Sequence, residues 1–239
     1  MALPSPEELR ARIPGVGDLV ARALAEVLGR RGEDPARIKD EFSSYFEEIE
    51  HRQFELYKIA EHEAWDELVG PGGHVLRGRF DEVYQLINSI AQSRRSRAGS
   101  AFEDVIKALF RRLGYPCDEQ AVVNGKPDFI LPSAEHYRRH AQDTIIFTCK
   151  RTLRERWRQI ATEGTRGLGH FLGTIDGSIG PRLLEEMRTN RIYLVVPKDV
   201  KDATAAYREA PNVISFEDFF EDHVDPAMRR WRRAGVIPP

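Results

Sequence analysis

An acid and a lysine mark two short apolar segments in the middle of the sequence. Asp128 opens the segment DFILP at 128–132, and Lys150 closes the segment TIIFTCK at 144–150. A carboxylate is a ligand that Mg²⁺ prefers, and a neighbouring ammonium group can orient a water molecule and offset phosphate charge. The pair therefore favours hydrolysis of a phosphodiester, whose transition state gains negative charge and needs a hard cation. Taken alone, it is equally compatible with a turn carboxylate and a solvated strand end.

Arginines crowd the segment that follows Lys150. Charged residues stand here at Arg151, Arg154, Glu155, Arg156 and Arg158. Arginine donates two hydrogen bonds to guanine O6 and N7, and glutamate accepts one from cytosine N4. The residues Arg154, Glu155 and Arg156, hereafter the Arg-Glu-Arg triplet, therefore suit the reading of adjacent G·C pairs. The alternative is a charged helix face exposed to solvent.

Strands that alternate with helices must position these side chains. Short apolar runs predict strands at 120–123, 128–131, 144–148, 191–196 and 212–215. Asn124 and Gly125 predict a tight turn that joins the first two strands as a hairpin. Helical spacing is present at 152–163, 167–175, 181–189 and 199–208. This alternation predicts an α/β core.

The N-terminal third of the chain has helical periodicity. Apolar residues recur at helical spacing over 5–30, on either side of the turn IPGVG at 13–17, and again over 36–68. The turn either offers backbone N–H groups to a DNA phosphate, as a helix-hairpin-helix element does, or joins an ordinary pair of helices.

The sequence GPGG at 70–73 breaks this helical pattern. Further helices are predicted at 80–90 and from Ser100 to a stop at Gly114. We therefore expect a helical N-terminal region at 1–70, which forms a dimer interface or clasps a partner, and a second domain at 71–239.

Charge is segregated along the chain although the formal net charge is only −2. Basic residues cluster at 94–97, 107–112, 150–158 and 229–233, whereas glutamates crowd 41–67. Bulk charge therefore gives no support to a nucleic-acid partner, but the basic clusters supply the local surface that a DNA-binding protein needs.

The cysteines and the hydropathy pattern limit the setting of the protein. Cys117 and Cys149 are not in CxxC spacing, so neither a zinc site nor a disulfide framework is implied. A reducing, cytoplasmic location is expected. No apolar run has signal-peptide character or approaches the ~18 residues of a membrane span, so no membrane partner is expected.

The segment 127–163 resembles the PD-(D/E)xK nuclease motif of type II restriction endonucleases. Pro127 and Asp128 match the PD pair, but Thr148 stands where an acid normally precedes the lysine by two residues. One branch of this superfamily, which cuts CCGG, CCNGG or CCWGG sites, carries that acid on a following helix. Glu163 stands thirteen residues after Lys150, and the Arg-Glu-Arg triplet matches the R-(D/E)-R element of the same branch.

The fuller resemblance is to the EcoRII catalytic-domain and PspGI subgroup and covers roughly residues 90–180. It is carried by QSRRSRAGSAFE at 92–103, PDFILP at 127–132 and CKRTLRERWRQI at 149–160. The resemblance implies a restriction-endonuclease-like α/β core, with a mixed central sheet flanked by helices, as the nuclease domain at 71–239.

The resemblance also implies a role for individual residues. Asp128 and Glu163 are expected to be Mg²⁺ ligands, Lys150 the catalytic lysine, and Glu103 an additional catalytic acid. The Arg-Glu-Arg triplet is expected to read bases. Further DNA contacts are expected from Gln92, Arg94 and Arg97, with Gln92 facing the centre of the site from the minor groove.

The implied activity is that of a type II site-specific deoxyribonuclease acting on double-stranded DNA. Mg²⁺-dependent attack of water on phosphorus would cut a palindrome with a CC/GG core and leave 5′-phosphates. A homodimer is expected, since each strand needs one active site, and dimers could pair into a tetramer. A cognate DNA methyltransferase would belong to the same system. The alternatives are a structure-specific or repair nuclease on the same fold and an inactive DNA-binding regulator.

The placement of Glu163 sets a geometric condition. A helix rising ~1.5 Å per residue from Thr152 would carry Glu163 about 16 Å away from Lys150. We therefore expect residues 151–156 to form a loop or helix entry, with the helix proper beginning near Trp157. A continuous helix from Thr152 would contradict the Glu163 assignment.

Overall fold

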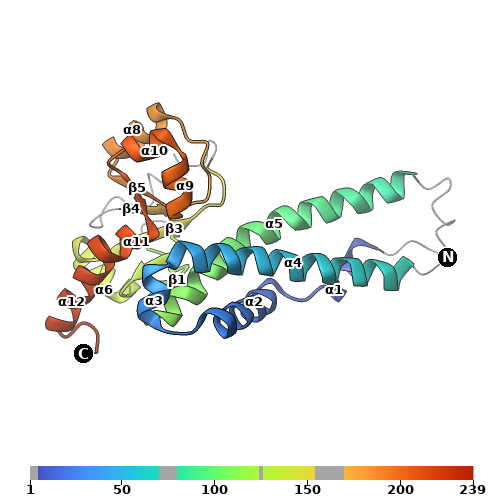
Figure 1. Ribbon diagram of the computed structural model, residues 1–239, viewed down its shortest axis with the longest axis horizontal. Coiled ribbons are helices and arrows are strands. Elements are labelled where there is room, and N and C mark those ends of the chain that lie inside the picture. Colours follow the sequence, from blue (N-terminus) through green and yellow to red (C-terminus); the bar gives the residue numbers. More distant parts are fainter. Residues whose placement is uncertain (1–4, 70–79, 124–125, 154–169, 239) are drawn as a thin grey trace. The chain divides into compact units, whose positions relative to one another are not determined.

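The computed structural model describes residues 5–69, 80–123, 126–153 and 170–238. The chain forms two compact units, each built from two separate segments (Figure 1). The helical unit comprises Met1–Gly32 and Glu47–Val105, and the sheet unit comprises Glu33–Phe46 and Ile106–Pro239. These compact units do not follow the division at residue 70. The functional regions 1–70 and 71–239 stay a prediction.

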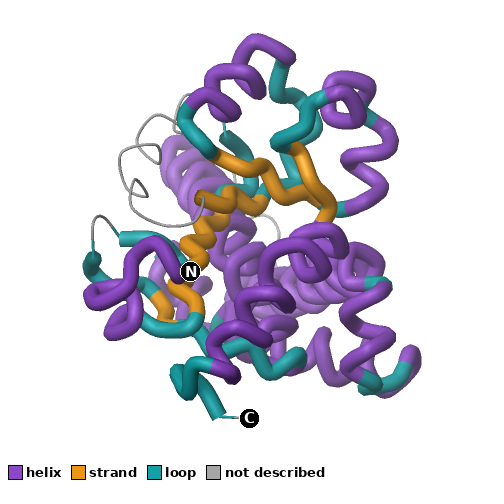
Figure 2. The backbone as a smooth tube through the Cα atoms, turned by 90° about the vertical axis from the view of Figure 1, so that its left-hand side faces the viewer, coloured by secondary structure: helices purple, strands orange, loops and turns teal. Residues whose placement is uncertain are grey.

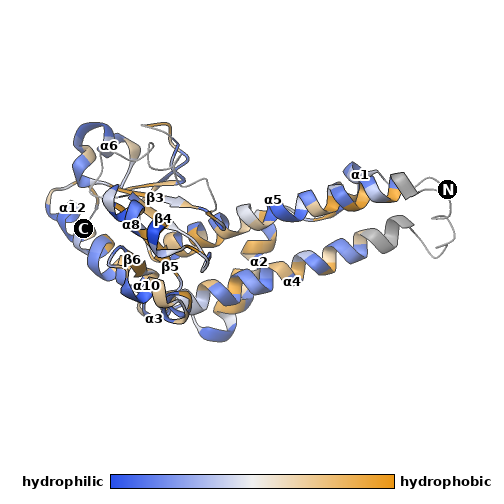
Figure 3. Cartoon of the chain, turned by 90° about the horizontal axis from the view of Figure 1, so that it is seen from above, coloured by the Kyte–Doolittle hydropathy of each residue, from blue (hydrophilic) through white to orange (hydrophobic). Residues whose placement is uncertain are grey.

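Amphipathic helices build the helical unit. Helix α1 (Pro6–Arg12) begins at a capping box, in which Ser5 Oγ accepts a hydrogen bond from the Glu8 N–H and the Glu8 carboxylate accepts one from the Ser5 N–H. Helix α2 spans Val16–Arg31. Helices α4 (Phe42–Val69) and α5 (Phe80–Arg112) run in opposite directions, and their apolar and polar residues lie on separate faces (Figure 3). Among the described residues, no helix is long and apolar enough to cross a membrane.

Two long helical predictions needed correction. The helix expected over 36–68 is divided near Glu41 into α3 (Pro35–Asp40) and α4. The helices expected at 80–90 and from Ser100 form one continuous helix of 33 residues, α5. The connecting stretch is rich in Arg, Gln and Ser, which helices tolerate, and its single glycine costs only about 1 kcal/mol relative to alanine. Packing of the apolar residues on either side offsets that cost.

One mixed sheet organises the sheet unit (Figure 2). Its strands are β1 (Asp118–Glu119), β2 (Phe129–Leu131), β3 (Ile145–Cys149), β4 (His170–Gly173), β5 (Ile192–Val196) and β6 (Val213–Ser215). Their order in the sheet is β1-β2-β3-β4-β5-β6. The β1–β2 and β2–β3 pairs are antiparallel, whereas β3 to β6 pair in parallel. A mixed sheet with flanking helices confirms the predicted fold class.

The hairpin before the site is antiparallel as predicted, but its first strand begins earlier. The strand expected at 120–123 lies instead at β1, which pairs with β2 through Glu119 and Phe129. Gln120 has a φ of 46°, a left-handed conformation that ends the strand. The predicted turn at Asn124 and Gly125 lies outside the described residues.

Strand β4 corrects the helix predicted over 167–175. His170–Gly173 is buried between β3 and β5 and pairs in parallel with both. A strand buried on both faces has a continuous apolar run without alternation, and a short buried helix shows the same pattern. Gly173 meets the requirement for close packing, because a Cβ at this position would lie 2.7 Å from the Phe147 ring.

The two faces of the sheet carry different cores. Alternation along the strands places Ile146 and Leu172 on one face. Helices α6 (Ala134–His140) and α8 (Pro181–Thr189) supply the buried side chains that pack there.

Aromatic side chains fill the opposite face. Phe147 and Phe171 pack against Phe219, with ring centroids 5.2 and 4.8 Å apart, and Phe147 also packs against Phe110 of α5.

The C-terminal elements are α9 (Lys198–Ala203), α10 (Ala205–Glu209), α11 (Phe216–Phe219), a π-helical turn at Phe220–Val224 and α12 (Asp225–Arg233). These two cores fix the strand ends beside Asp128 and Lys150.

Candidate active site

Asp128 and Lys150 meet at one end of the β2–β3 pair. Because Phe129 is opposite Phe147, Asp128 lies opposite Thr148 in the next position of the ladder. The Cys149 N–H donates a hydrogen bond of 2.6 Å to Asp128 Oδ2, and Lys150 Nζ lies 3.4 Å from the same oxygen. Asp128 is only 8% exposed. The structure thus brings together the acid and the lysine that the sequence singled out.

The backbone on both sides of this pair is held in place. The Gln120 N–H donates to the Asp128 carbonyl at 2.9 Å, and the Lys150 N–H donates to the Gly173 carbonyl at 2.9 Å. Within the described part of the chain, the second carboxylate oxygen of Asp128, Oδ1, accepts no hydrogen bond. That oxygen is therefore available to a cation.

A neutral pair occupies the position where the nuclease motif normally has an acid. Thr148 and His170 are both buried, and His170 Nε2 lies 3.2 Å from Thr148 Oγ1. Burial lowers the pKa of His170 to about 4, so the imidazole is uncharged at neutral pH. Its Nδ1 is buried and has no hydrogen-bond partner among the described residues. Sequence reasoning gave His170 no role, because its place beside Thr148 becomes visible only when β4 is recognised as a strand.

The chain after Lys150 does not continue as a helix. Arg151, Thr152 and Leu153 are non-helical, as the placement of Glu163 requires. Arg151 is half-buried, and burial lowers the pKa of its guanidinium group. Leu153 is fully buried in the core beside α8. The Arg-Glu-Arg triplet and Glu163 lie in 154–169, outside the described residues, so their predicted roles stay predictions.

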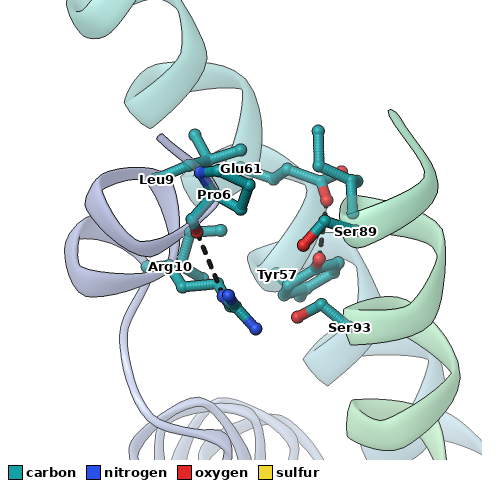
Figure 4. Close-up of a pocket in the computed structure, with 9 residues that line it drawn as sticks. Pro6, Leu9, Arg10, Tyr57, Glu61, Ser89 and Ser93 are labelled. Carbon is teal, nitrogen blue, oxygen red and sulfur yellow. Dashed lines mark hydrogen bonds between the residues drawn. The ribbon is translucent and has the colours of Figure 1, made fainter. Parts of the chain in front are cut away.

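The other predicted site residues lie on α5 within the helical unit. Gln92 and Arg94 are exposed, and Glu103 is half-buried. Arg94 donates to both carboxylate oxygens of Glu61, with Nε 3.1 and 3.0 Å away. Glu61 also accepts a 2.6 Å hydrogen bond from the Tyr57 hydroxyl (Figure 4).

Arg97 has internal contacts as well. Its Nη1 donates to the Pro14 carbonyl at 2.9 Å, and its guanidinium group lies 5.2 Å from the centre of the Tyr57 ring. The first of these contacts ties α5 to the 13–17 turn. The predicted roles of Gln92, Arg94 and Arg97 in DNA binding stay predictions.

Asp128 is a described carboxylate that could contribute to a metal site. Among the described residues there is no cluster of three His, Cys, Asp or Glu side chains that could hold a metal ion. A hard divalent cation such as Mg²⁺ keeps several waters and is held by as few as one or two carboxylates. Asp128 Oδ1, which accepts no hydrogen bond within the described part of the chain, could be one ligand of such an ion.

Known proteins with similar sequences are restriction enzymes. The type II restriction enzyme SsoII of Shigella sonnei is 30% identical over 164 residues, which is 62% of this chain and 52% of that enzyme. The type II restriction enzyme EcoRII of Escherichia coli is 33% identical over 129 residues, or 52% of this chain and 32% of that enzyme. The matched regions thus span about half or less of these relatives' own lengths.

Solved structures show the same fold. Metal-depleted Ecl18kI in complex with uncleaved DNA aligns with a TM-score of 0.80 and 23% identity, over 95% of this chain and 86% of that chain. The PspGI–substrate DNA complex aligns with a TM-score of 0.74 and 20% identity, over 95% and 96% of the two chains. The family model described as EcoRII C terminal matches residues 58–220, well over half of the sequence. The chain belongs to the EcoRII C-terminal family of type II restriction endonucleases.

Proposed function

We propose that this protein is a type II site-specific deoxyribonuclease that cuts both strands of a palindromic DNA site with a CC/GG core, such as CCNGG, CCWGG or CCGG. The observation that carries the proposal is the buried Asp128 carboxylate beside Lys150, which has one oxygen without a hydrogen bond from any described residue. Membership of the EcoRII C-terminal family supports the reaction class. The similarity to Ecl18kI and PspGI, both solved with DNA, supports double-stranded DNA as the substrate.

Asp128 and Glu163 would hold Mg²⁺. The bound ion would offset the charge that develops on the scissile phosphate and favour ionisation of a bound water. Asp128 also keeps Lys150 in place, because both the Lys150 ammonium group and the Cys149 N–H approach its Oδ2. The ammonium group would donate a hydrogen bond to the attacking water or to a phosphate oxygen. Water would then attack phosphorus in line, the 3′-oxygen would leave, and the phosphate would stay on the 5′ end of the cut.

The Arg-Glu-Arg triplet would read the G·C pairs of the site. The donors of two arginines match guanine O6 and N7, and the glutamate matches cytosine N4. Gln92, Arg94 and Arg97 would make further DNA contacts, and Glu103 would assist the metal site. A palindromic site calls for a homodimer, and dimers could pair into a tetramer. A DNA methyltransferase of the same specificity would protect the host DNA.

Digestion of a plasmid tests the activity. The purified protein is incubated with supercoiled plasmid in Mg²⁺ and in EDTA, and the ends are sequenced. We expect discrete fragments only with Mg²⁺, with every end at one CC/GG-containing site and a 5′-phosphate. Cleavage restricted to branched or flapped DNA would instead identify a structure-specific nuclease. Specific binding without any cleavage would identify an inactive regulator.

Alanine variants test the recognition residues. Arg154→Ala or Arg156→Ala should reduce discrimination between the cognate site and a single-base variant by roughly 1–3 kcal/mol for each lost bidentate contact. Arg158→Ala is the matched control, because it removes a neighbouring positive charge outside the triplet. Equal losses on specific and random DNA would show that the triplet contacts phosphates and does not read bases.

A further inference from the structure

Residues of the loop between β4 and α8 form hydrogen bonds with the segment that follows Lys150. Asp176 in this loop accepts a hydrogen bond of 3.1 Å from the Leu153 N–H through Oδ2. Its other oxygen, Oδ1, accepts from the Ser178 N–H at 3.0 Å and from the Ser178 hydroxyl at 2.5 Å. A turn of the loop alone would use only Oδ1. The contact with Leu153 therefore joins two separate segments of the chain.

Thr174 holds the same segment at a second point. Its hydroxyl donates a hydrogen bond of 3.2 Å to the Arg151 carbonyl and accepts one of 3.1 Å from the Asp176 N–H. The Thr174 N–H donates to the Val195 carbonyl of β5 at 2.9 Å, and Thr174 is fully buried. The Arg151 carbonyl is thereby tied to the central sheet.

Asp176 is itself held in place by a residue of the core, Tyr207. The Tyr207 hydroxyl donates to the Asp176 carbonyl and accepts a 3.3 Å hydrogen bond from the Ile179 N–H. Burial raises the pKa of Tyr207 to about 12, so this donor keeps its proton at neutral pH. The Leu153 side chain packs fully buried against the same core. Main chain and side chain together thus fix the path of residues 151–153.

We infer that Thr174 and Asp176 act as positioning residues for sequence recognition, because they set the direction in which the chain passes from Lys150 to the Arg-Glu-Arg triplet. Among the described residues on this segment, the last one they hold is Leu153, and the next one along the chain is Arg154, the first member of the triplet. A residue spans at most about 3.6 Å of extended chain, so Arg154 begins within one residue length of a fixed backbone group.

This inference builds on the proposed function, because it takes the triplet as the base-reading element. A shift of about 1 Å in a positioned group can cost on the order of a hundredfold in rate. Loss of the Leu153 contact should therefore reduce cleavage of the cognate site and discrimination against near-cognate sites, without removing any group that touches DNA or metal.

The experiment compares Asp176→Ala with Ser178→Ala in the full-length protein. Asp176→Ala removes the acceptor of the Leu153 N–H, whereas Ser178→Ala keeps the Leu153 contact and loses only the hydroxyl bond. We expect Asp176→Ala to lower kcat/KM on the cognate site roughly tenfold to a hundredfold, to reduce the ratio of kcat/KM on the cognate site to kcat/KM on single-base-variant sites, and to leave affinity for random DNA unchanged. Ser178→Ala should stay within about twofold of the parent protein on every substrate, since its changes lie outside the Leu153 contact.

Hydrogen exchange of the Leu153 amide gives a readout that does not depend on cleavage. We expect faster exchange at Leu153 in Asp176→Ala, which lacks the acceptor, than in Ser178→Ala. If the parent protein shows no site-specific cleavage but this exchange difference appears, the proposed function fails and the backbone contact stands. Unchanged exchange, or equal loss of activity on cognate and variant sites, overturns the positioning role.

Thr174→Val provides a second route if Asp176→Ala does not fold. Valine keeps the buried shape of threonine and removes the donor to the Arg151 carbonyl. The same narrowing of discrimination is expected, and parent-like discrimination by a folded Thr174→Val protein would overturn the inference.

Discussion

Two buried carboxylates, one in each compact unit, meet their cations in different ways. Glu61 in the helical unit is 4% exposed, and Asp128 in the sheet unit is 8% exposed. Arg94 donates to both oxygens of Glu61, and the Tyr57 hydroxyl donates to one of them. Within the described part of the chain, Asp128 receives the Cys149 N–H and Lys150 on one oxygen, Oδ2, and no donor approaches the other.

The difference separates an acid whose two oxygens are both hydrogen-bonded from one with an oxygen that no described donor reaches. Burial by itself raises the pKa of Glu61, but the hydrogen bonds from Arg94 and Tyr57 outweigh it and hold that pKa below its usual value. Both carboxylate oxygens of Glu61 thus accept hydrogen bonds from residues of the helical unit. A buried carboxylate with an oxygen to spare is costly unless a cation or donor completes it. Completeness of hydrogen bonding thus distinguishes the two acids better than burial does.

The largest expected effect separates the two acids by activity. Asp128→Asn should lower the cleavage rate by on the order of a thousandfold or more, because an amide cannot replace a charged metal ligand. The amide oxygen can still accept the Cys149 N–H, so the fold should persist. Glu61→Gln is the matched control and should cut at a rate close to that of the parent protein. Rapid cleavage by Asp128→Asn, measured on the mapped site in Mg²⁺, would remove Asp128 from the active site.

A somewhat smaller effect on the cleavage rate is expected from substitution of Lys150. Lys150→Gln should slow single-turnover cleavage by roughly a hundredfold to a thousandfold, because a neutral amide offsets no charge on the phosphate. Lys198→Gln in the same unit changes an exposed lysine and should have no effect on the rate. If both variants cut at the parent rate, Lys150 serves only as the ion-pair partner of Asp128.

The uncharged state of His170 should be visible as pH-dependent stability. Burial depresses its folded-state pKa to about 4, whereas the unfolded imidazole titrates near 6.5. The unfolded state therefore binds more protons between these values, and stability falls as pH falls through this window. From pH 7.5 to 5.0 the loss due to His170 should be about 2 kcal/mol.

Urea unfolding of the parent protein and of His170→Leu at the two pH values measures this contribution. The variant should lose about 2 kcal/mol less than the parent protein over the same interval. Equal losses of stability would mean that His170 is solvated or charged in the folded protein. They would contradict an uncharged His170 beside Thr148.

The smallest expected effect concerns the stability of the helical unit. Glu61→Gln should lower the free energy of unfolding by about 1–2 kcal/mol at pH 7, because Arg94 and Tyr57 lose a charged acceptor. The Arg94 side chain is 48% exposed, so water takes over part of its hydrogen bonding and keeps the loss small. Since the folded pKa of Glu61 is lowered, this contribution is present above the ordinary carboxylate range and disappears as pH falls through the folded value. Denaturant unfolding that shows no change at pH 7 would contradict the structural role of Glu61.

Much of the sheet unit could be predicted from local sequence. The apolar runs that became β3, β5 and β6 end at charged or turn residues, which indicate strand boundaries. The same pattern located Asp128 and Lys150 at adjacent strand ends, and antiparallel pairing then brought their side chains together. Strand β4 was missed, because its pairing with β3 and β5 is not a local property of the sequence.

The rest of the candidate site depends on register and loop contacts that no short pattern encodes. The pair of Thr148 and His170 forms only because β3 and β4 align in parallel. The contact of Asp176 with Leu153 joins residues 23 positions apart through a backbone N–H, which every residue type except proline could supply. The resemblance and the basic cluster at 94–97 predict DNA contacts for Arg94 and Arg97, and their partners within the protein could not be inferred from the sequence.

The interleaved segments of the two compact units limit how folding can proceed during synthesis. Residues Glu33–Phe46 belong to the sheet unit although they lie between two segments of the helical unit. Phe42 packs against Phe216 and Phe220, and Ser43 binds Glu217, 174 residues further along the chain. The first turn of α4 therefore leaves the ribosome long before its partners exist. Its apolar face must stay uncovered until residues 216–220 have been synthesised, so the sheet unit can reach its native packing only after that point of translation.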